Sequence, residues 1–221
     1  MQSKAVTRVF MVLGILALAS SVMMAQDSKL PHQSITKKSN IIHEAPAPPP
    51  GIVTLYTNLG PTGDTYDGGQ GWTISGPDSV LGFDQAIAQP YTPTANSTIK
   101  GVQLGLGYVE GGDDFGVAIY SDANGLPGNP IQEWVPQVGG TFGTCCTLDT
   151  VTDKDGTKVT AGTQYWIVVG WSNTNLTLYG VWDFTYNQSQ GTVAFAASDN
   201  ANKWKTFSGT QTAYAIYGTT P

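Results

Sequence analysis

The chain has 221 residues and a formal net charge of −6 that is distributed unevenly along its length. Residues 51–221 hold five lysines, no arginine and fourteen acidic residues, so this part alone carries a formal charge of −9. Because affinity for phosphate depends on clustered lysine and arginine, nucleic acid is excluded as an expected partner, and acidic lipid headgroups are disfavoured for the same reason.

The amino-terminal segment has the layout of a secretory signal peptide. Lys4 and Arg8 precede an apolar run over residues 9–19, and small residues follow up to Ala25. The run is too short to span a bilayer comfortably, since a spanning helix needs about 20 apolar residues. We therefore predict a signal peptide over residues 1–25, with its cleavage position left open, and no membrane insertion after cleavage.

Residues 26–50 are polar and then rich in proline, a composition that buries little surface and favours extended polyproline II. Both histidines of the chain, His32 and His43, lie in this segment. We interpret the segment as a disordered, proline-rich linker and the two histidines as incidental polar residues within it.

From residue 51 onwards the period of β-strands dominates. In residues 102–108 the large apolar side chains recur at every second position, and Phe115, Val117 and Ile119 repeat the pattern. Residues 162–171 form the most apolar stretch, which we place at the centre of the fold. Further strands are expected at residues 52–56, 80–88, 131–135, 148–151, 181–184, 193–197 and 214–217.

Glycine, asparagine and aspartate cluster between these strands, notably in residues 122–128 and 153–156, where tight turns are expected. Short strands punctuated in this way predict an all-β fold, a jelly-roll-like antiparallel β-sandwich formed by residues 51–221 as a single domain. No internal repeat of fixed period is found, which argues against a propeller or a solenoid.

Several motifs in this order resemble one known family. They are IYSDANGLPGNPIQEW (residues 119–134), FGTCC (142–146) and TAGTQYW (160–166), preceded by YDGG (66–69) and GW (71–72). The chain resembles the bacterial choice-of-anchor R domain from about residue 53 to residue 218. That resemblance implies an exported β-sandwich module of unestablished function, often followed by an anchoring segment. Only four residues follow Tyr217 here, so we expect a secreted or periplasmic protein.

Residues 51–221 contain no histidine, arginine or methionine, which closes several classes of chemistry. Nucleophilic triads need an imidazole as base, and histidine-containing metal sites need one as ligand. Glycoside hydrolysis needs only two carboxylates, for which Glu110 and Glu133 are the only glutamates. Both are expected to be solvated surface groups, so we predict no enzymatic activity.

The only two cysteines, Cys145 and Cys146, are adjacent. In an oxidising, exported compartment two neighbouring thiols tend to oxidise, and within one monomer they can only pair with each other. We expect a vicinal disulfide that fixes the local loop, with intermolecular bridges and buried thiols as the alternatives.

Asp153 and Asp155, in the sequence DKDGT, have the oxygen-rich character of a calcium loop. The match to an EF-hand stops early, because no glutamate occupies the closing position. No cofactor is therefore expected, and a structural calcium ion at Asp153 and Asp155 is kept as a candidate.

All six tryptophans lie beyond residue 51. Trp166 and Trp134 alternate with strand neighbours and are expected to be buried. Trp72 and Trp204 are flanked by polar residues and glycine, so they are the candidates for exposed indoles that stack on a ligand such as a sugar ring.

These observations predict a noncatalytic, exported β-sandwich that acts as an interaction or structural module of the cell envelope or extracellular space. One alternative is a carbohydrate-binding module, and another is a self-assembling surface or matrix subunit. The expected partner is accordingly a polysaccharide or a surface protein.

Overall fold

The computed structural model describes residues 50–138, 140–197 and 204–221. The predicted signal peptide and all but the last residue of the predicted linker lie outside these ranges. Within them every regular element is a strand, and no helix is long and apolar enough to cross a membrane. The strands are β1 (Val53–Thr57), β2 (Tyr66–Ser75), β3 (Gln85–Tyr91), β4 (Ser97–Glu110), β5 (Asp114–Asp122), β6 (Pro127–Val138), β7 (Gly140–Thr141), β8 (Leu148–Val159), β9 (Tyr165–Trp171), β10 (Tyr179–Thr185), β11 (Gln190–Ala197), β12 (Lys205–Thr210) and β13 (Tyr214–Thr219).

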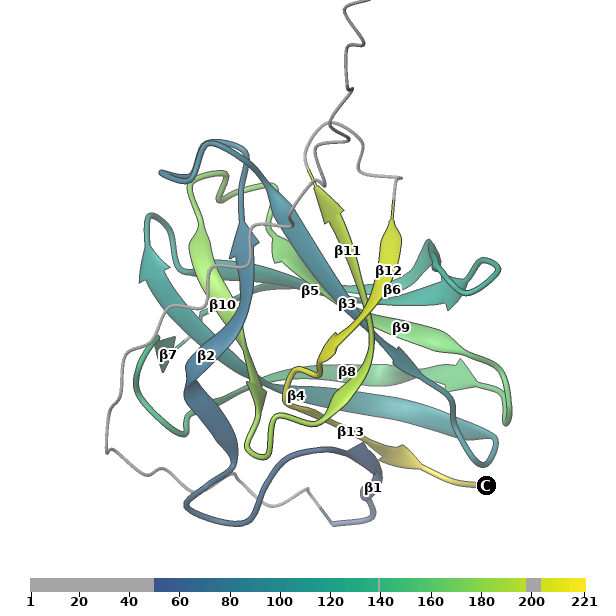
Figure 1. Cartoon of the computed structure of the whole chain (residues 1–221). Coiled ribbons are helices and arrows are strands. Elements are labelled where there is room, and N and C mark those ends of the chain that lie inside the picture. Colours follow the sequence, from purple (N-terminus) through teal and green to yellow (C-terminus); the bar gives the residue numbers. More distant parts are fainter. Residues whose placement is uncertain (1–49, 139, 198–203) are drawn as a thin grey trace, which may run out of the picture. The chain divides into compact units, whose positions relative to one another are not determined.

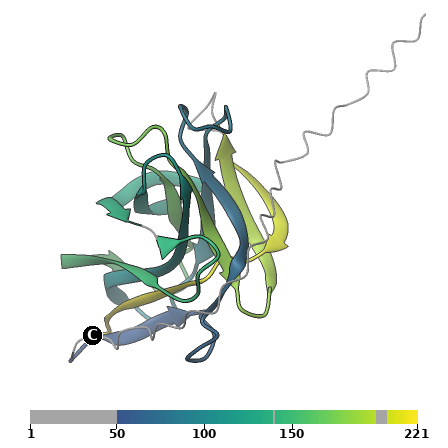
Figure 2. The same ribbon diagram turned by 90° about the vertical axis from the view of Figure 1, so that its left-hand side faces the viewer.

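One sheet in the order β1-β13-β4-β10-β2-β3-β9-β5-β6 connects most of these strands, with β11 and β12 continuing from β3 and β8 pairing with β4. The long strand β4 joins the two layers, because its first half pairs with β13 and β8 while its last residues pair with β10. The ladders are antiparallel except for the short β4–β7 pairing. The predicted jelly-roll-like antiparallel sandwich is thus confirmed (Figures 1 and 2).

The core lies between the layer of β1, β13, β4 and β8, at the bottom of Figure 1, and the layer that contains β2, β3, β9 and β5. Leu104 and Leu106 of β4 enter it from one side, and Ile87, Ile167 and Val169 enter it from the other. All five side chains are almost completely buried. Strand β9 lies between β3 and β5, which confirms the central position predicted for the apolar stretch at residues 162–171.

The strand predicted at residues 80–88 begins later than expected. Val80 is 65% exposed and lies in a turn, in which the amide of Gly82 donates to the carbonyl of Ser79. The strand itself starts at Gln85 and continues to Tyr91. Proline, aspartate and glycine around Val80 favour the turn, and they outweigh the weak strand preference of one valine.

The segment at residues 153–156 is a bulge within β8 and not the turn predicted for it. Thr152 pairs with Gly101 and Thr157 with Ile99, so residues 153–156 all lie opposite the single residue Lys100. Gly156 has a φ of 81°, a conformation that residues with a side chain rarely adopt. The turn-forming composition is therefore used to bend a continuous strand.

Strand β2 was not predicted, because its sequence YDGGQGWTIS lacks an alternating apolar pattern. Its glycines have a packing role. A side chain at Gly71 would collide with the side chain of Val181 and with the backbone of Trp182 on β10. Close approach of β2 and β10, rather than local propensity, makes this segment a strand.

The turn predicted at residues 122–128 is present as the connection between β5 and β6. The Asp122 carboxylate accepts hydrogen bonds from the Gly125 amide at 3.0 Å, from the buried Trp166 indole at 2.9 Å and from Gln164 at 2.8 Å. Burial acts to raise the pKa of Asp122, but these hydrogen bonds outweigh it and the pKa is lowered. One carboxylate thus ties the turn to the central strand β9.

We expect Asp122→Ala to lower the free energy of unfolding by about 2 kcal/mol at neutral pH, because the Trp166 indole and the turn lose a charged acceptor. Urea denaturation followed by circular dichroism measures the change. Asp64→Ala, at an exposed position, is the control and should change stability little. An equal effect of the two substitutions would contradict the role assigned to Asp122.

Candidate functional site

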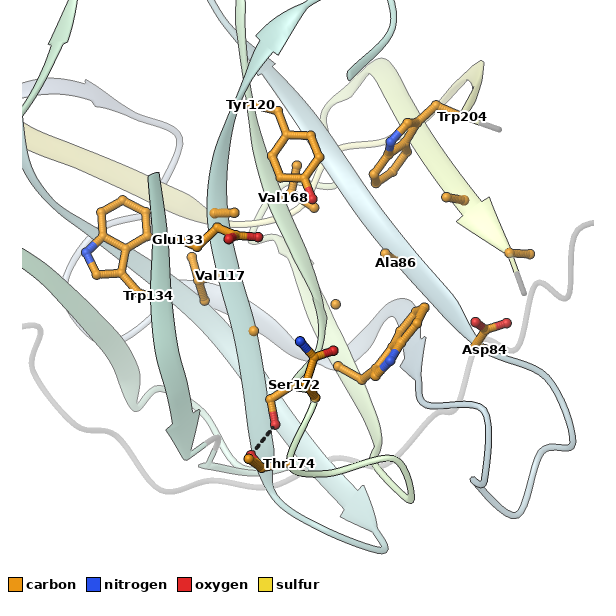
Figure 3. Close-up of a pocket in the computed structure, with 17 residues that line it drawn as sticks. Asp84, Ala86, Val117, Tyr120, Glu133, Trp134, Val168, Ser172, Thr174 and Trp204 are labelled. Atoms are coloured by element: carbon orange, nitrogen blue, oxygen red, sulfur yellow. Dashed lines mark hydrogen bonds between the residues drawn. The ribbon is translucent and has the colours of Figure 1, made fainter. Parts of the chain in front are cut away.

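An open groove of about 400 Å³ lies on the outer face of the β6–β5–β9–β3–β11 part of the sheet. This face is opposite the one that packs into the core. Figure 3 shows residues that line the groove, which come from β3, β5, β6, β9 and β11 and from the segments next to them. Its size lies within the usual range for small-molecule and sugar-binding sites.

Small side chains from neighbouring strands form the floor. The registers align Glu133 of β6 with Ala118 of β5, and Ala118 with Val168 of β9. The row continues to Ala88 of β3 and Ala194 of β11, which are not among the lining residues. In the next row Gly116 pairs with Gly170, and Ala86 pairs with Ala196. Because side chains alternate between the faces of a strand, the bulky Ile87, Val117 and Val169 point to the core instead.

Aromatic side chains form the wall. Tyr120 on β5 and Trp204 just before β12 pack edge to face, with ring centroids 6.3 Å apart and planes at 78°. Both rest on the small-residue cluster of Ala88, Ala118 and Val168. Both are half-buried, which leaves part of each ring accessible from the groove.

Polar groups are distributed along the same groove. Glu133 is exposed, and its carboxyl lies close to the Tyr120 phenol. Burial of Tyr120 raises the pKa of this phenol, and the negative charge of Glu133 raises it further. Towards the other end lie Asp84 and the hydrogen-bonded hydroxyls of Ser172 and Thr174, whose oxygens are 3.0 Å apart. The groove therefore combines apolar ring faces with hydrogen-bonding groups.

Only one of the two tryptophans predicted as ligand-binding lies in the groove. Trp204 lines it. Trp72 lies outside it, where its ring packs edge to face on Phe184 and Phe207 and its indole nitrogen donates to the Thr210 carbonyl at 2.8 Å. Flanking polar residues suggested exposure, but pairing of β2 with β10 places Trp72 in an aromatic cluster.

Sequence reasoning did not identify Tyr120, Trp171 or Asp84 as lining residues. A usable signal was present, since alanine and glycine recur on one face of β3, β5, β9 and β11 while branched residues occupy the other face. Trp166 is completely buried as predicted, and Trp134 is half-buried, with its indole nitrogen donating to the Thr152 carbonyl at 3.1 Å.

Cys145 and Cys146 are joined in a disulfide between adjacent residues. Their loop packs on β2, where Cys145 Sγ lies 3.3 Å from the Tyr66 carbonyl oxygen and the Gly143 amide donates to Gly68. The Tyr66 hydroxyl in turn donates to the Thr147 carbonyl at 3.0 Å. The disulfide therefore belongs to a loop that is fixed on the sheet from both sides.

Three aspartates gather beside this loop, and we call Asp67, Asp149 and Asp183 the acidic cluster. Burial, followed by the charges of Asp67 and Asp149, raises the pKa of Asp183 well above its ordinary value. Burial also raises the pKa of Asp149 to about 7, although a hydrogen bond from the Gly140 amide acts against it. Asp183 Oδ1 and Asp149 Oδ2 are buried without a hydrogen-bond partner in the described part of the chain. Burial thus favours the protonated form of both carboxyls.

The acidic cluster makes stability depend on pH. A carboxyl whose pKa is higher in the folded state binds more protons when folded, so its contribution is present at low pH and is lost as pH rises through the folded pKa. We expect the free energy of unfolding to fall by roughly 2–4 kcal/mol between about pH 4 and pH 7. Asp149→Asn should reduce this fall, as measured by urea denaturation across the range.

Asp64→Asn is the matched control for that experiment, because it removes the same charge from an exposed position. An unchanged slope in Asp149→Asn, or the same change in both variants, would show that general charge repulsion and not the buried carboxyl governs the pH dependence.

The candidate calcium residues lie in the β8 bulge. The Asp153 carboxylate accepts hydrogen bonds from the Asp155 amide and the Thr157 hydroxyl, both at 3.1 Å. The Lys100 ammonium donates to the carbonyls of Lys154 and Asp155 at 2.8 and 3.0 Å. No group of three or more histidine, cysteine or acidic side chains arranged to hold a metal occurs in the described ranges. The Lys100 ammonium thus binds backbone carbonyl oxygens, which are among the ligands that a calcium ion takes.

We expect a chelator to leave the thermal midpoint of unfolding unchanged, because the Lys100 ammonium already binds the carbonyl oxygens of the bulge. Loss of a bound ion would lower the midpoint by several degrees, which differential scanning calorimetry resolves. Lys100→Met is the control and should lower the midpoint equally with and without chelator. A chelator-dependent fall in the wild type would instead establish calcium at Asp153 and Asp155.

A comparison with models of protein families finds no match, and neither does a search of curated proteins. The resemblance to the choice-of-anchor R domain therefore stays a prediction. Function has to be argued from the groove and its chemistry.

Proposed function

We propose that the chain is a noncatalytic, exported β-sandwich module that binds a polysaccharide in the groove on the outer face of its sheet. The observation that carries this proposal is the combination of an aromatic wall, Tyr120 and Trp204, with a floor of alanine and glycine. Among the functions predicted from the sequence, this combination favours a carbohydrate-binding module over an unspecified interaction module.

The groove matches the chemistry of a sugar ring. A pyranose has faces of C–H groups that stack on aromatic rings and a rim of hydroxyls that form hydrogen bonds. The small floor lets such a ring approach the sheet closely. Glu133, Ser172, Asn173 and Thr174 supply polar groups along the edges. Apolar lining with a few placed polar groups is the usual composition of a ligand site.

Two carboxylates line the groove, but their separation argues against glycoside hydrolysis. The registers place Glu133 in the same row as Ala88, which lies three strands away. At the usual strand spacing the backbones of these two residues are roughly 14 Å apart. Asp84 lies four residues before Ala88, which adds roughly 13 Å along the strand direction. Paired catalytic carboxyls are about 5–9.5 Å apart. Glu110, the other candidate acid, does not line the groove.

Export is supported by the amino-terminal sequence and by the disulfide. The signal-peptide pattern over residues 1–25 predicts secretion or periplasmic residence, and a disulfide between Cys145 and Cys146 is stable in such oxidising compartments. A binding module outside the cytoplasm meets polysaccharides of cell walls and matrices, which fits the proposed ligand.

Self-assembly through strand edges is less well supported. Strand β6 pairs only with β5 in the sheet and carries Pro127 and Pro130, which cannot donate to a further strand. The free side of β8 is interrupted by the bulge opposite Lys100 and carries charged residues. Prolines, bulges and charges at sheet edges disfavour pairing between molecules.

We expect Tyr120→Ala and Trp204→Ala each to weaken polysaccharide binding by about tenfold or more, since buried aromatic contacts dominate such sites. A panel of glycans is first screened by affinity electrophoresis to find the ligand. Isothermal titration calorimetry then measures the affinity of the wild type and of each variant for that ligand. Tyr186→Ala removes a 41% exposed aromatic outside the groove and should bind as the wild type does. Failure of the wild type to bind any glycan in the panel would refute the proposal.

A further inference from the structure

We infer that the groove selects glycans that carry free, protonated amino groups, such as glucosamine polymers, over neutral and acidic glycans. The inference rests on the proposed function, because it names the ligand class of the same groove. Three observations carry it: the position of Glu133, the orientation of the two aromatic rings, and the charge of the lining residues.

Glu133 supplies a negative charge inside the ligand site. The register pairs it with Ala118, two residues from Tyr120 on the same face of β5, so its carboxyl lies beside the aromatic wall. In Figure 3 this carboxyl lies next to the Tyr120 ring and Trp204 lies on the other side. Among the described residues no hydrogen bond or ion pair engages the Glu133 carboxylate, so its acceptor capacity is available to a ligand.

The two rings complement this charge. Because Tyr120 and Trp204 are nearly perpendicular, a ligand in the corner between them meets the face of only one ring, and this negative face, not the positive edge of the other ring, is what attracts a cation. A cation over an aromatic face is attracted by the ring quadrupole, and a carboxylate at the same place adds a full counter-charge. An ammonium group on a stacked sugar ring satisfies both, whereas a neutral hydroxyl gains only a hydrogen bond.

No basic side chain is among the described residues that line the groove. Lys205 follows Trp204 directly but is not a lining residue. Among the lining residues that the structure describes, acidic sugars would therefore meet Glu133 and no basic side chain, in a domain whose formal charge is −9. Asp84, the other acidic residue that lines the groove, is buried and already takes part in an interaction within the protein, so Glu133 is the carboxylate assigned to the ligand.

The test compares a glucosamine hexamer with its fully N-acetylated counterpart, which has the same backbone and no charge. At mildly acidic pH and low ionic strength, calorimetry should give the wild type about tenfold higher affinity for the amine form, and added salt should reduce the difference. Glu133→Gln keeps the shape and hydrogen-bonding capacity of the side chain, so it should remove most of this preference, with a much larger loss of affinity for the amine form than for the acetylated form.

Glu110→Gln is the matched control, because it neutralises the other glutamate at a position outside the groove. Equal affinity of the wild type for both hexamers, or an unchanged preference in Glu133→Gln, would overturn the inference while the proposed function stands. An equal loss of preference in Glu110→Gln would show that only the overall charge matters, which also overturns it. Binding of neither hexamer, nor of any other glycan in the panel, would overturn the inference and the proposed function together.

Discussion

The division of β3, β5, β9 and β11 into one bulky face and one small face governs both the core and the groove. Isoleucine and valine on the inner face fill the space between the layers, as Ile87, Val117 and Val169 do. The alternate positions on the same strands hold mostly alanine and glycine along the groove, for example Ala86, which pairs with Ala196, although Val168 and Trp166 of β9 lie on this face as well. A strand with large residues on both faces would stabilise the same sheet but leave no concavity for a ligand.

The fold was predictable where one strand carries its own pattern. Residues 102–108 and 162–171 alternate or are continuously apolar, and both are strands in the core. Strand β2 was not predictable, since Gly71 is required only because β10 lies against it, and β10 is more than a hundred residues away in sequence. Local patterns contain no information about such a neighbour.

The groove illustrates the same limit. Trp204 could be selected from its polar flanks, but the same rule also selected Trp72, which is held in an aromatic cluster by residues from β10 and β12. The alternation of Phe115, Val117 and Ile119 places Tyr120 on the opposite face, but the residues that share this face with it are known only from the register to β9. A binding surface assembled from several strands depends on register, whereas a core position depends mainly on period.

One continuous segment of the chain builds one side of the groove. Residues 119–134 comprise the end of β5, the turn and the first part of β6, and they contribute Tyr120 and Glu133 to the site. Within the turn, Asp122 is tied to the buried Trp166. Since Trp166 pairs with Tyr120 across β5 and β9, the turn fixes the backbone that carries the aromatic wall.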